Sequence, residues 1–438
     1  MEVKMKDQKA ILEKFGIKEL NEMQLEAHEA ILSHDEVILL SPTGTGKTLA
    51  FLLPIIEELD PNSKEIQVLI LVPSRELAIQ IEQVTRDMGS GFKANAVYGG
   101  RAGSKDKADL KHPPAILIGT PGRVADHIRR KNINRHKIKI LVLDEFDKSL
   151  EIGYENEMKE IVNALHFAKR KILTSATEKV EIPGFVRLKD PKRLNFLDEK
   201  QDLLKLRTVI APEKKKLHTL KHLIGHIGNG RGIIFCNLKD TIFAVNEFLD
   251  DQNIDHTCFF GGMEQIEREH SLIKFRNGTH RLLVATDLAA RGIDVPELDF
   301  IIHLELPLRE DEFTHRNGRT ARMHSNGTAY ILKWRGEELP SFAKDIEVQE
   351  IKENEVAGSP QWDTLYISGG RKDKISKGDI AGLFFKKGEL QKEELGNIEL
   401  KQDCAFVAVP IQKAEKLIVL LNNSKLKKKK VRISLLER

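Results

Sequence analysis

A loop rich in glycine and hydroxyl side chains is the first segment with an obvious chemical use. Residues 41–48 read SPTGTGKT, after an apolar run and before a helix-like segment. Gly44 and Gly46 let the backbone bend so that successive N–H groups face a phosphate chain, and the helix N-terminus adds partial positive charge. Lys47 would reach the β- and γ-phosphates, and the Thr48 hydroxyl would ligate Mg²⁺. The loop predicts a phosphate site.

An acidic segment further along the chain is the second candidate. Residues 144–147 read DEFD and follow the apolar run Ile140–Leu143. Carboxylates at the carboxyl end of a parallel strand point into the crevice where ligands bind. Asp144 would hold Mg²⁺ through its water shell, and Glu145 would orient and deprotonate an attacking water. Alone, such a segment is most often a solvated turn; following a phosphate loop, it favours hydrolysis.

Apolar, β-branched runs alternate with helical patterns along most of the chain. Such alternation predicts parallel sheets with crossover helices, and strands buried on both faces read as continuous apolar runs. The runs that predict strands are Glu36–Leu40, Val68–Val72, Ala115–Ile118, Ile140–Leu143, Ile172–Thr174, Gly232–Phe235, Leu282–Ala285 and Phe300–His303. The fold class is therefore α/β.

The pattern loosens near residues 190–215 and again across 336–360, which suggests domain boundaries. We place one α/β domain in residues 1–200, a second in 214–345 and a small third unit in 361–438. The third unit has the order β-α-β-β-α-β of a split-βαβ domain. Its predicted strands are 365–368, 398–400, 404–410 and 429–434, and its predicted helices are 375–385 and 411–422.

Composition excludes several classes of protein. The chain has 438 residues, 40% hydrophobic and 31% charged, with three widely spaced cysteines. It shows no run long enough to span a membrane, no secretion signal and no zinc-site or disulfide spacing. We expect a cytoplasmic protein without a membrane partner. The net charge is +4, but residues 361–438 carry 17 basic and 10 acidic side chains, which suggests that this unit contacts a polyanion.

A series of short blocks extends the two candidate sites into a family pattern. In chain order they are Gln24, SPTGTGKT (41–48), PSRELA (73–78), Gly99-Gly100, TPGR (120–123), DEFD (144–147), SAT (175–177), IIFCN (233–237), Gln265 with Arg268, ATDLAARGIDVP (285–296) and HRNGRTAR (315–322). With these blocks the chain resembles a DEAD-box RNA helicase, a family with two tandem RecA-like parallel-sheet domains. The resemblance implies that ATP and Mg²⁺ are the ligands and that RNA closes the two domains.

The resemblance assigns a role to each matching residue of the ATP site. Gln24 would read the adenine edge, Asp294 would contact the ribose, and Arg319 and Arg322 would be arginine fingers on the γ-phosphoryl group. Ser175 and Thr177 would couple ATP to RNA. The implied phosphate-binding residues are Ser41, Thr43, Gly44, Thr45, Gly46, Lys47 and Thr48.

The resemblance also implies contacts with the RNA backbone, which is held without reading its sequence. In the first domain these residues are Pro73, Arg75, Gly99, Gly100, Thr120, Pro121, Gly122 and Arg123. In the second domain they are Arg268 and Thr286.

The third unit resembles the RRM-like RNA-binding domain of DbpA-type helicases, a small α+β fold. The resemblance implies tethering to large-subunit ribosomal RNA, with Arg371, Lys372, Lys428 and Lys430 as candidate contacts. An ordinary RRM stacks bases on aromatic side chains of its third strand. Because that strand has the single aromatic Phe406 here, we expect binding through loops and basic edges.

Three blocks depart from the family pattern, the mildest being Arg-Asn-Gly at 316–318. DEFD replaces DEAD, so the change falls on Phe146 and spares Asp144 and Glu145. The segment before Gln24 has Leu20 and Asn21 where the family usually has Pro and Thr, which makes ATP preference less certain than hydrolysis.

The sequence therefore predicts an ATP-dependent RNA helicase that remodels structured RNA, with ribosomal RNA in pre-ribosomal particles as its partner and a monomeric state. Two alternatives stay open. One is an ATP-dependent RNA clamp with slow turnover, and the other is a DNA-dependent ATPase.

Overall fold

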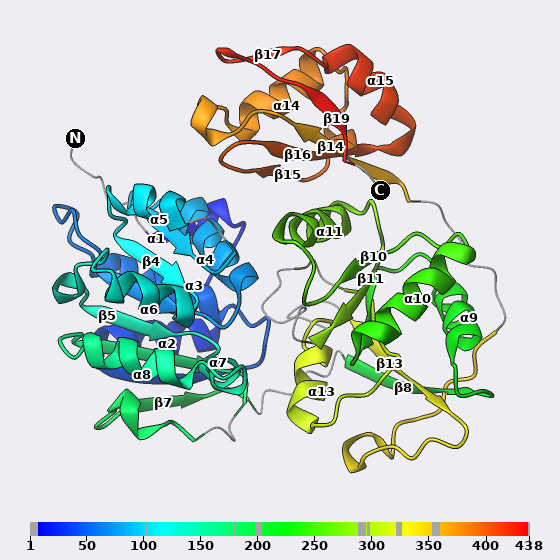
Figure 1. Cartoon of the computed structure of the whole chain (residues 1–438), viewed down its shortest axis with the longest axis horizontal. Coiled ribbons are helices and arrows are strands. Elements are labelled where there is room, and N and C mark those ends of the chain that lie inside the picture. The colour runs from blue at the N-terminus through cyan, green and yellow to red at the C-terminus, as the bar shows by residue number, and fades with distance from the viewer. Residues whose placement is uncertain are drawn as a thin grey trace. The chain divides into compact units, whose positions relative to one another are not determined.

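A computed structural model describes residues 8–100, 103–177, 181–197, 204–287, 295, 298–320, 326–352 and 360–436. The described residues form three larger sheets that follow one another along the chain, and a two-stranded hairpin (Figure 1). Among the described residues, no helix is both long and apolar enough to cross a membrane.

The first sheet has seven parallel strands in the order β3-β4-β2-β5-β6-β1-β7. The strands are β1 (Glu36–Leu40), β2 (Val68–Leu71), β3 (Ala94–Val97), β4 (Ile116–Gly119), β5 (Ile140–Leu143), β6 (Arg170–Ser175) and β7 (Lys192–Asn195). The helices around it are α1 (Gln8–Lys14), α2 (Glu22–Ser33), α3 (Lys47–Glu57), α4 (Arg75–Met88), α5 (Gly103–Leu110), α6 (Pro121–Arg129), α7 (Phe146–Glu151) and α8 (Glu155–Ala164). An apolar core lies on each face, as in doubly wound sheets.

The second sheet has six parallel strands in the order β10-β11-β9-β12-β13-β8. They are β8 (Leu204–Ala211), β9 (Gly232–Cys236), β10 (Thr257–Phe259), β11 (Leu282–Thr286), β12 (Phe300–His303) and β13 (Gly327–Trp334). Its helices are α9 (Leu217–Ile227), α10 (Lys239–Asp251), α11 (Gln265–Asn277) and α13 (Glu310–Asn317).

The third sheet is antiparallel, in the order β15-β16-β14-β19. Its strands are β14 (Trp362–Ile367), β15 (Ile398–Leu400), β16 (Ala405–Pro410) and β19 (Ile433–Leu435), and one face is covered by α14 (Lys377–Lys386) and α15 (Ile411–Leu421). The predicted fold class is confirmed: two RecA-like parallel-sheet domains precede a small α+β domain.

The end of the third unit differs from the predicted single strand at 429–434. A hairpin of β17 (Lys425–Leu426) and β18 (Lys429–Lys430) comes first, and β19 follows. Lys427, at the hairpin turn, has φ +53, a left-handed conformation that no strand residue adopts. The lysine run therefore forms a turn beside the sheet.

Two edge strands lie in the stretch 190–215, where the sequence pattern loosens. β7 closes one edge of the first sheet, and β8 closes one edge of the second sheet by pairing with β13. Edge strands are covered less than central ones; in β7 only Leu194 is buried. Their apolar pattern is correspondingly weak.

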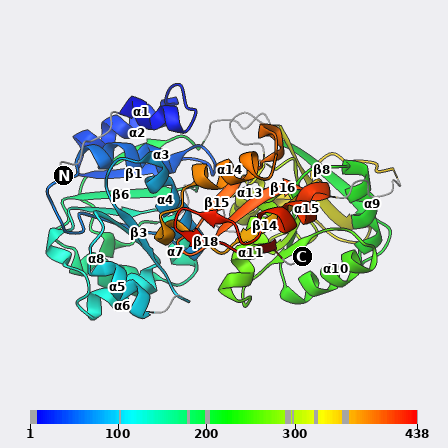
Figure 2. The same cartoon turned by 90° about the horizontal axis from the view of Figure 1, so that it is seen from above.

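The second face of the antiparallel sheet packs on α11 (Figures 1 and 2). Phe406 is 2% exposed and clusters with Ile273 of α11. Thr364 of β14 bonds to Asn277 Nδ2 at 3.1 Å and to Thr279 Oγ1 at 2.7 Å. This face, which an RRM uses to stack bases, is buried by contacts within the chain.

An ion pair fixes the same interface from its rim. Arg276 Nη1 of α11 lies 2.7 Å from Glu399 Oε1 of β15, and Lys401 Nζ lies 2.7 Å from Glu269 Oε1. Burial pushes the pKa of Glu399 upward, but the charges of Arg276 and Lys401 outweigh burial and lower it. The carboxylate therefore stays charged at this interface.

Candidate nucleotide and RNA sites

The phosphate loop connects β1 to α3 and holds its lysine inward. Gly44 and Gly46 both have φ +89, which side chains with a Cβ rarely adopt. Lys47 Nζ donates to the carbonyl oxygens of Ser41 at 2.6 Å and Pro42 at 2.7 Å. The loop is stabilised by the 2.7 Å contact between the Ser41 and Thr45 hydroxyls.

This arrangement places the ammonium group of Lys47 at the N-terminus of α3. Lys47 is 9% exposed, and Thr43 and Thr48 are half-buried in the same loop. Phosphate oxygens are stronger acceptors for an ammonium group than backbone carbonyls are. The loop can therefore exchange its internal carbonyl bonds for bonds to a phosphate chain.

The segment before Gln24, which departs from the family pattern, is firmly attached to this loop. Asn21 caps α2, with Asn21 Oδ1 accepting from Gln24 N at 2.8 Å and Gln24 Oε1 accepting from Asn21 N at 3.1 Å. The amide of Asn21 donates to Thr45 O at 3.2 Å, and that of Gln24 donates to Gly46 O at 3.3 Å. This capping box, Asn-x-x-Gln, was readable in the sequence but overlooked. It brings Gln24 to the loop.

Asp144 and Glu145 follow β5 at its carboxyl end. Asp144 is 3% exposed, and its Oδ1 accepts from the Thr174 hydroxyl. Burial raises the pKa of Asp144 against the opposing effects of Thr174 and Lys47. Glu145 N donates to Thr174 Oγ1 at 3.1 Å, and Glu145 has φ +47, a left-handed conformation. Such strain is concentrated at functional sites.

The oxygen ligands at this edge fit a magnesium ion. The Asp144 carboxylate and the Thr48 hydroxyl are hard oxygen donors, and Mg²⁺ usually takes only one or two carboxylates besides phosphates and water. Across the described parts of the chain, no group of three or more His, Cys, Asp or Glu side chains could hold a metal by itself. The site thus fits an ion that arrives with phosphates.

The SAT segment contacts the acidic segment directly. Thr177 Oγ1 donates to Asp147 Oδ2 at 3.2 Å, and Ser175 Oγ donates to Thr177 O at 2.8 Å. Burial raises the pKa of Asp147 to about 6. Phe146, the departure from DEAD, is 2% exposed and packs in one of the two apolar cores of this domain.

The first group of predicted RNA contacts gathers where β2 and β3 end. Pro73 precedes α4, and Arg75 is the first residue of α4. Gly100 has φ +85, and a Cβ there would lie 2.7 Å from Arg75 Nη1. The guanidinium group therefore lies on the backbone of Gly99 and Gly100, and glycine is required for this approach.

The second group lies at the start of α6, after β4. Thr120 caps the helix, and Pro121 is its first residue. A Cβ on Gly122 would meet no heavy atom within 4 Å, so its backbone is open to a ligand. Arg123 Nε donates to Asp106 Oδ2 at 2.7 Å. Sequence analysis found Arg123 but missed Asp106, which belongs to no motif.

In the second sheet, a buried arginine organises the predicted finger region. Arg316 is 2% exposed and bonds to Asp287 Oδ2 at 3.0 Å, Asn237 Oδ1 at 2.7 Å and Glu305 O at 2.6 Å. Arg319 follows in the next turn and is 5% exposed. Asp294 and Arg322 lie outside the described residues. Arg316 is a third arginine of the motif that the predicted roles did not include.

The unusual Asn317 has a partner inside the fold. His303 Nε2 donates to Asn317 Oδ1 at 2.9 Å, and His303 is fully buried between Phe235 and Phe313. Burial, reinforced by the charge of Arg316, lowers the pKa of His303 to about 3, so the ring is neutral. The departure at Asn317 is thus matched by His303.

The predicted RNA contacts of the second sheet lie on two elements. Thr286 ends β11, and Arg268 lies on α11. The Arg268 guanidinium is 4.4 Å from the centre of the Phe259 ring, and its Nη1 donates to Phe260 O at 3.3 Å.

The basic residues of the third unit divide into two sets. Lys428 and Lys430 are exposed on the β17–β18 hairpin. Lys372 is paired with Asp403 at 2.5 Å and Arg371 is half-buried beside it. The hairpin therefore offers the more accessible charge.

Comparisons with known proteins identify the family of the chain. The DEAD/DEAH box helicase family model matches residues 21–182, the helicase conserved C-terminal domain matches 215–324, and the DbpA RNA binding domain matches 364–435. The DEAD-box ATP-dependent RNA helicase CshC of Bacillus cereus is 33% identical over 353 residues, 79% of this chain and 91% of CshC.

Two further matches extend this result. The ATP-dependent RNA helicase DbpA of Bacillus subtilis is 29% identical over 459 residues, 97% of this chain and 96% of that protein. The structure of S. cerevisiae Dbp5 bound to RNA and ADP BeF3 is similar with a TM-score of 0.66 and 26% identity, covering 76% of this chain and 88% of Dbp5. The chain therefore belongs to the DEAD-box family of ATP-dependent RNA helicases, and it is of the DbpA type with that subgroup's C-terminal RNA-binding domain.

Proposed function

We propose that this helicase remodels large-subunit ribosomal RNA in pre-ribosomal particles, and that its third unit targets it to this RNA. One observation carries this proposal: the DbpA-type domain buries its sheet face on α11 yet exposes the lysines of the β17–β18 hairpin. Because the stacking face is covered, RNA would bind through basic loops and edges. Lys428 and Lys430 are the leading contacts, with Arg371 and Lys372 beside the sheet.

The residues of the first domain support a hydrolytic role. Lys47 would leave the Ser41 and Pro42 carbonyls for the β- and γ-phosphates, and Gln24 would read the adenine edge. Glu145, held by Thr174, would orient and deprotonate the attacking water. When bound, Mg²⁺ would neutralise charge on the phosphates, with Asp144 and Thr48 as its protein-side ligands.

The second domain would complete this site. Arg319 and Arg322 would stabilise charge on the transferring phosphoryl group, and Asp294 would contact the ribose. Arg316, held by Asp287 and Asn237, keeps the end of α13 in place beside Arg319. Because the fingers and Lys47 belong to different domains, hydrolysis would depend on the RNA that closes them.

The RNA-binding residues would act on the backbone alone. Arg75 over Gly99 and Gly100, and the open backbone at Gly122, suit close approach of a sugar–phosphate chain. Pro73, Thr120, Pro121 and Arg123 join them from the first domain, and Arg268 and Thr286 from the second. Bending of the bound strand would separate short duplexes, and hydrolysis would reset the enzyme.

The three parts of the chain would have separate roles. Residues 1–200 would act as the ATP-binding domain, 214–345 as the second helicase domain and 361–438 as the RNA-binding domain. The protein would work as a monomer in the cytoplasm.

The test is steady-state ATP hydrolysis by the full chain at fixed salt. We would add large-subunit ribosomal RNA, an unrelated RNA of equal length or single-stranded DNA. The proposal expects ribosomal RNA to stimulate at the lowest concentration. Equal stimulation by both RNAs would exclude a targeting role of the third unit for ribosomal RNA. Equal stimulation by DNA would favour a general nucleic-acid ATPase. Negligible turnover with every nucleic acid would favour an ATP-dependent clamp.

Point variants test the address better than truncation. Deleting the third unit would uncover Ile273 and other buried positions of α11. The double variant Lys428→Ala/Lys430→Ala keeps that interface and should reduce the preference for ribosomal RNA. Its matched control is Lys214→Ala/Lys215→Ala, which removes two exposed lysines from the second domain. An unchanged preference for ribosomal RNA in the first variant would show that other residues provide the targeting.

A further inference from the structure

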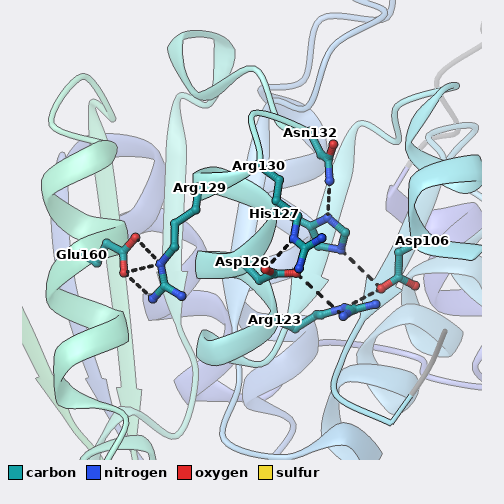
Figure 3. Close-up of polar contacts among 8 residues, drawn as sticks. All are labelled: Asp106, Arg123, Asp126, His127, Arg129, Arg130, Asn132 and Glu160. Carbon is teal, nitrogen blue, oxygen red and sulfur yellow. Dashed lines mark hydrogen bonds and ion pairs between the residues drawn. The ribbon is translucent and has the colours of Figure 1, made fainter. Parts of the chain in front are cut away.

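A buried carboxylate lies behind one of the proposed RNA contacts. Asp106 of α5 is 0% exposed, and its Oδ2 atom contacts two side chains of α6 (Figure 3). It accepts from Arg123 Nε at 2.7 Å and lies 3.3 Å from His127 Nε2. Arg123 and His127 are four residues apart, so they share one face of the helix.

The histidine in this group has a defined hydrogen-bonding role. His127 is 2% exposed, and its Nδ1 lies 3.0 Å from Asn132 Nδ2, an amide nitrogen that can only donate. Nδ1 is therefore the acceptor, and the proton on Nε2 points to Asp106. Asn132 N also donates to His127 O at 2.9 Å. A continuous chain of bonds thus runs from Asn132 through His127 and Asp106 to Arg123.

The chain of bonds makes Arg123 the cationic partner of the buried carboxylate. A buried carboxylate is strongly disfavoured unless it is paired and hydrogen-bonded. Arg123 carries a permanent positive charge, and its Nε lies 2.7 Å from this carboxylate. The Arg123 side chain is 17% exposed, and a Cβ on Gly103 would lie 3.2 Å from its Nη2. The guanidinium is therefore packed on the start of α5.

The other arginines of α6 and its C-cap form a contrast. Arg129 pairs with Glu160 at 2.6 Å and Arg130 pairs with Asp126 at 2.7 Å, but these arginine side chains are 55% and 69% exposed. Exposed ion pairs of this kind hold a side chain weakly. Figure 3 shows Arg123 directed toward Asp106 and Arg129 toward Glu160. Of the three arginines, Arg123 is the one with a fully buried partner.

We propose that Asp106 is a positioning residue for RNA binding, which acts by fixing the plane of the Arg123 guanidinium. The inference rests on the proposed contact of Arg123 with the RNA backbone. Guanidinium–phosphate bonds depend on the orientation of the planar fork, and a side chain ordered in advance loses less entropy on binding. Because Nε is bonded to Asp106, the direction in which both Nη groups donate is set before RNA arrives.

The first measurement is RNA-stimulated ATP hydrolysis by full-length variants. Asp106→Ala should raise the RNA concentration for half-maximal stimulation by about 10-fold, with kcat at saturating RNA and the KM for ATP within about 2-fold. Asp106→Asn keeps an acceptor for Nε but loses the charge, so its effect should be about 2- to 3-fold. Glu160→Gln, which breaks the exposed pair with Arg129, is the matched control and should change nothing.

The second measurement is a cycle with Arg123→Ala. If Asp106 acts through Arg123, adding Asp106→Ala to Arg123→Ala should produce no further loss of RNA affinity. The double variant should also unfold at a higher temperature than Arg123→Ala alone, because it removes a buried carboxylate that has lost its bond to Arg123.

The outcomes separate the two claims. If Arg123→Ala leaves the RNA requirement unchanged, the proposed RNA contact is wrong and the inference falls with it. If Arg123→Ala weakens RNA binding but neither Asp106 variant does, only the positioning role is wrong. An effect of Asp106→Ala that adds fully to that of Arg123→Ala would reveal a general folding defect and overturn the inference. Where Asp106→Ala does not fold, Asp106→Asn decides by the same criteria.

Discussion

The two parallel-sheet domains share an architecture but bury opposite chemistry where their strands end. In the first, the carboxylates of Asp144 and Asp147 follow β5, and burial raises both pKa values. In the second, Arg316 lies near the end of β12, where it donates to Glu305 O and lowers the pKa of His303, and Arg319 is buried in the turn after α13. One sheet therefore presents groups suited to a metal–phosphate ligand and to water activation. The other presents buried guanidinium groups.

The difference teaches how one fold is divided between two tasks. In each domain a neutral side chain bonds to a buried charged group: Thr174 bonds to Asp144, and Asn237, together with the carboxylate of Asp287, bonds to Arg316. The parallel sheet supplies the same set of strand ends in both cases. Chemistry is then assigned by which side chains follow the strands.

Replacing Glu145, the proposed base of the first domain, should have the largest effect on ATP turnover. Glu145→Gln should lower RNA-stimulated ATP turnover by about 10²–10⁴-fold, because the amide cannot accept a proton from water. ATP and RNA binding should persist. Single-turnover hydrolysis measures the effect, with Glu155→Gln, an exposed residue at the start of α8, as control. Turnover within a few-fold of the unchanged protein would exclude Glu145 as the base.

On the opposite side, Arg319→Ala should lower turnover by about 10²–10³-fold, since a charge that stabilises the transition state is lost. Arg309→Ala is the matched control, because Arg309 caps the same helix and pairs locally with Glu312 at 3.0 Å. Both variants are measured at saturating ATP and RNA. Equal activity of the two would refute a finger role for Arg319.

The raised pKa of Asp147 makes the first domain sensitive to pH. Between pH 3.8 and about 6 the folded chain holds a proton that the unfolded chain has released, so stability should fall as pH rises through this window. The contribution of Asp147 is about 3 kcal/mol, and Asp147→Asn should remove this part of the pH dependence while the part from Asp144 remains.

A probe inside the first domain is needed for that measurement. Both tryptophans, Trp334 and Trp362, belong to the other two sheets, so tryptophan fluorescence does not report on it. Hydrogen exchange of β5 and β6 peptides, corrected for the intrinsic pH dependence of exchange, does. Identical slopes for the variant and the unchanged chain would contradict the assignment to Asp147.

The smallest effect concerns the buried pair of the second domain. Asn317→Leu should destabilise this domain by about 1–3 kcal/mol, because His303 Nε2 loses its acceptor. His303→Leu/Asn317→Leu removes both polar groups and should cost less than the sum of the single changes. Urea unfolding followed by tryptophan fluorescence reports on this part of the chain. Additive losses would show that the two residues are uncoupled.

Short sequence patterns were sufficient to predict those parts of the candidate site whose residues lie close together in the chain. The phosphate loop, Asp144 with Glu145, and the SAT segment each lie within a few residues of a strand end, and apolar runs mark those strands. Motif order then supplied roles for Arg319 and Arg123. All of these roles stay predictions, and Asp294 and Arg322 lie outside the described residues.

The missed features depend on contacts between distant residues. Asp106 meets Arg123 through the packing of α5 on α6, and no motif includes it. His303 and Asn317 become partners only because β12 and α13 lie side by side. The edge strand β8 is half-exposed and has too weak an apolar pattern to be detected, although its register with β13 is long.

The docking of the third unit on α11 has a consequence for how such a chain can evolve. Arg276 faces Glu399, and Asn277 faces Thr364, so an ordinary surface helix of the helicase core carries the complement of another domain. A substitution on either side of this interface would need a compensating substitution on the other side. We therefore expect that a third unit exchanged from a relative would lose these contacts unless α11 were exchanged with it.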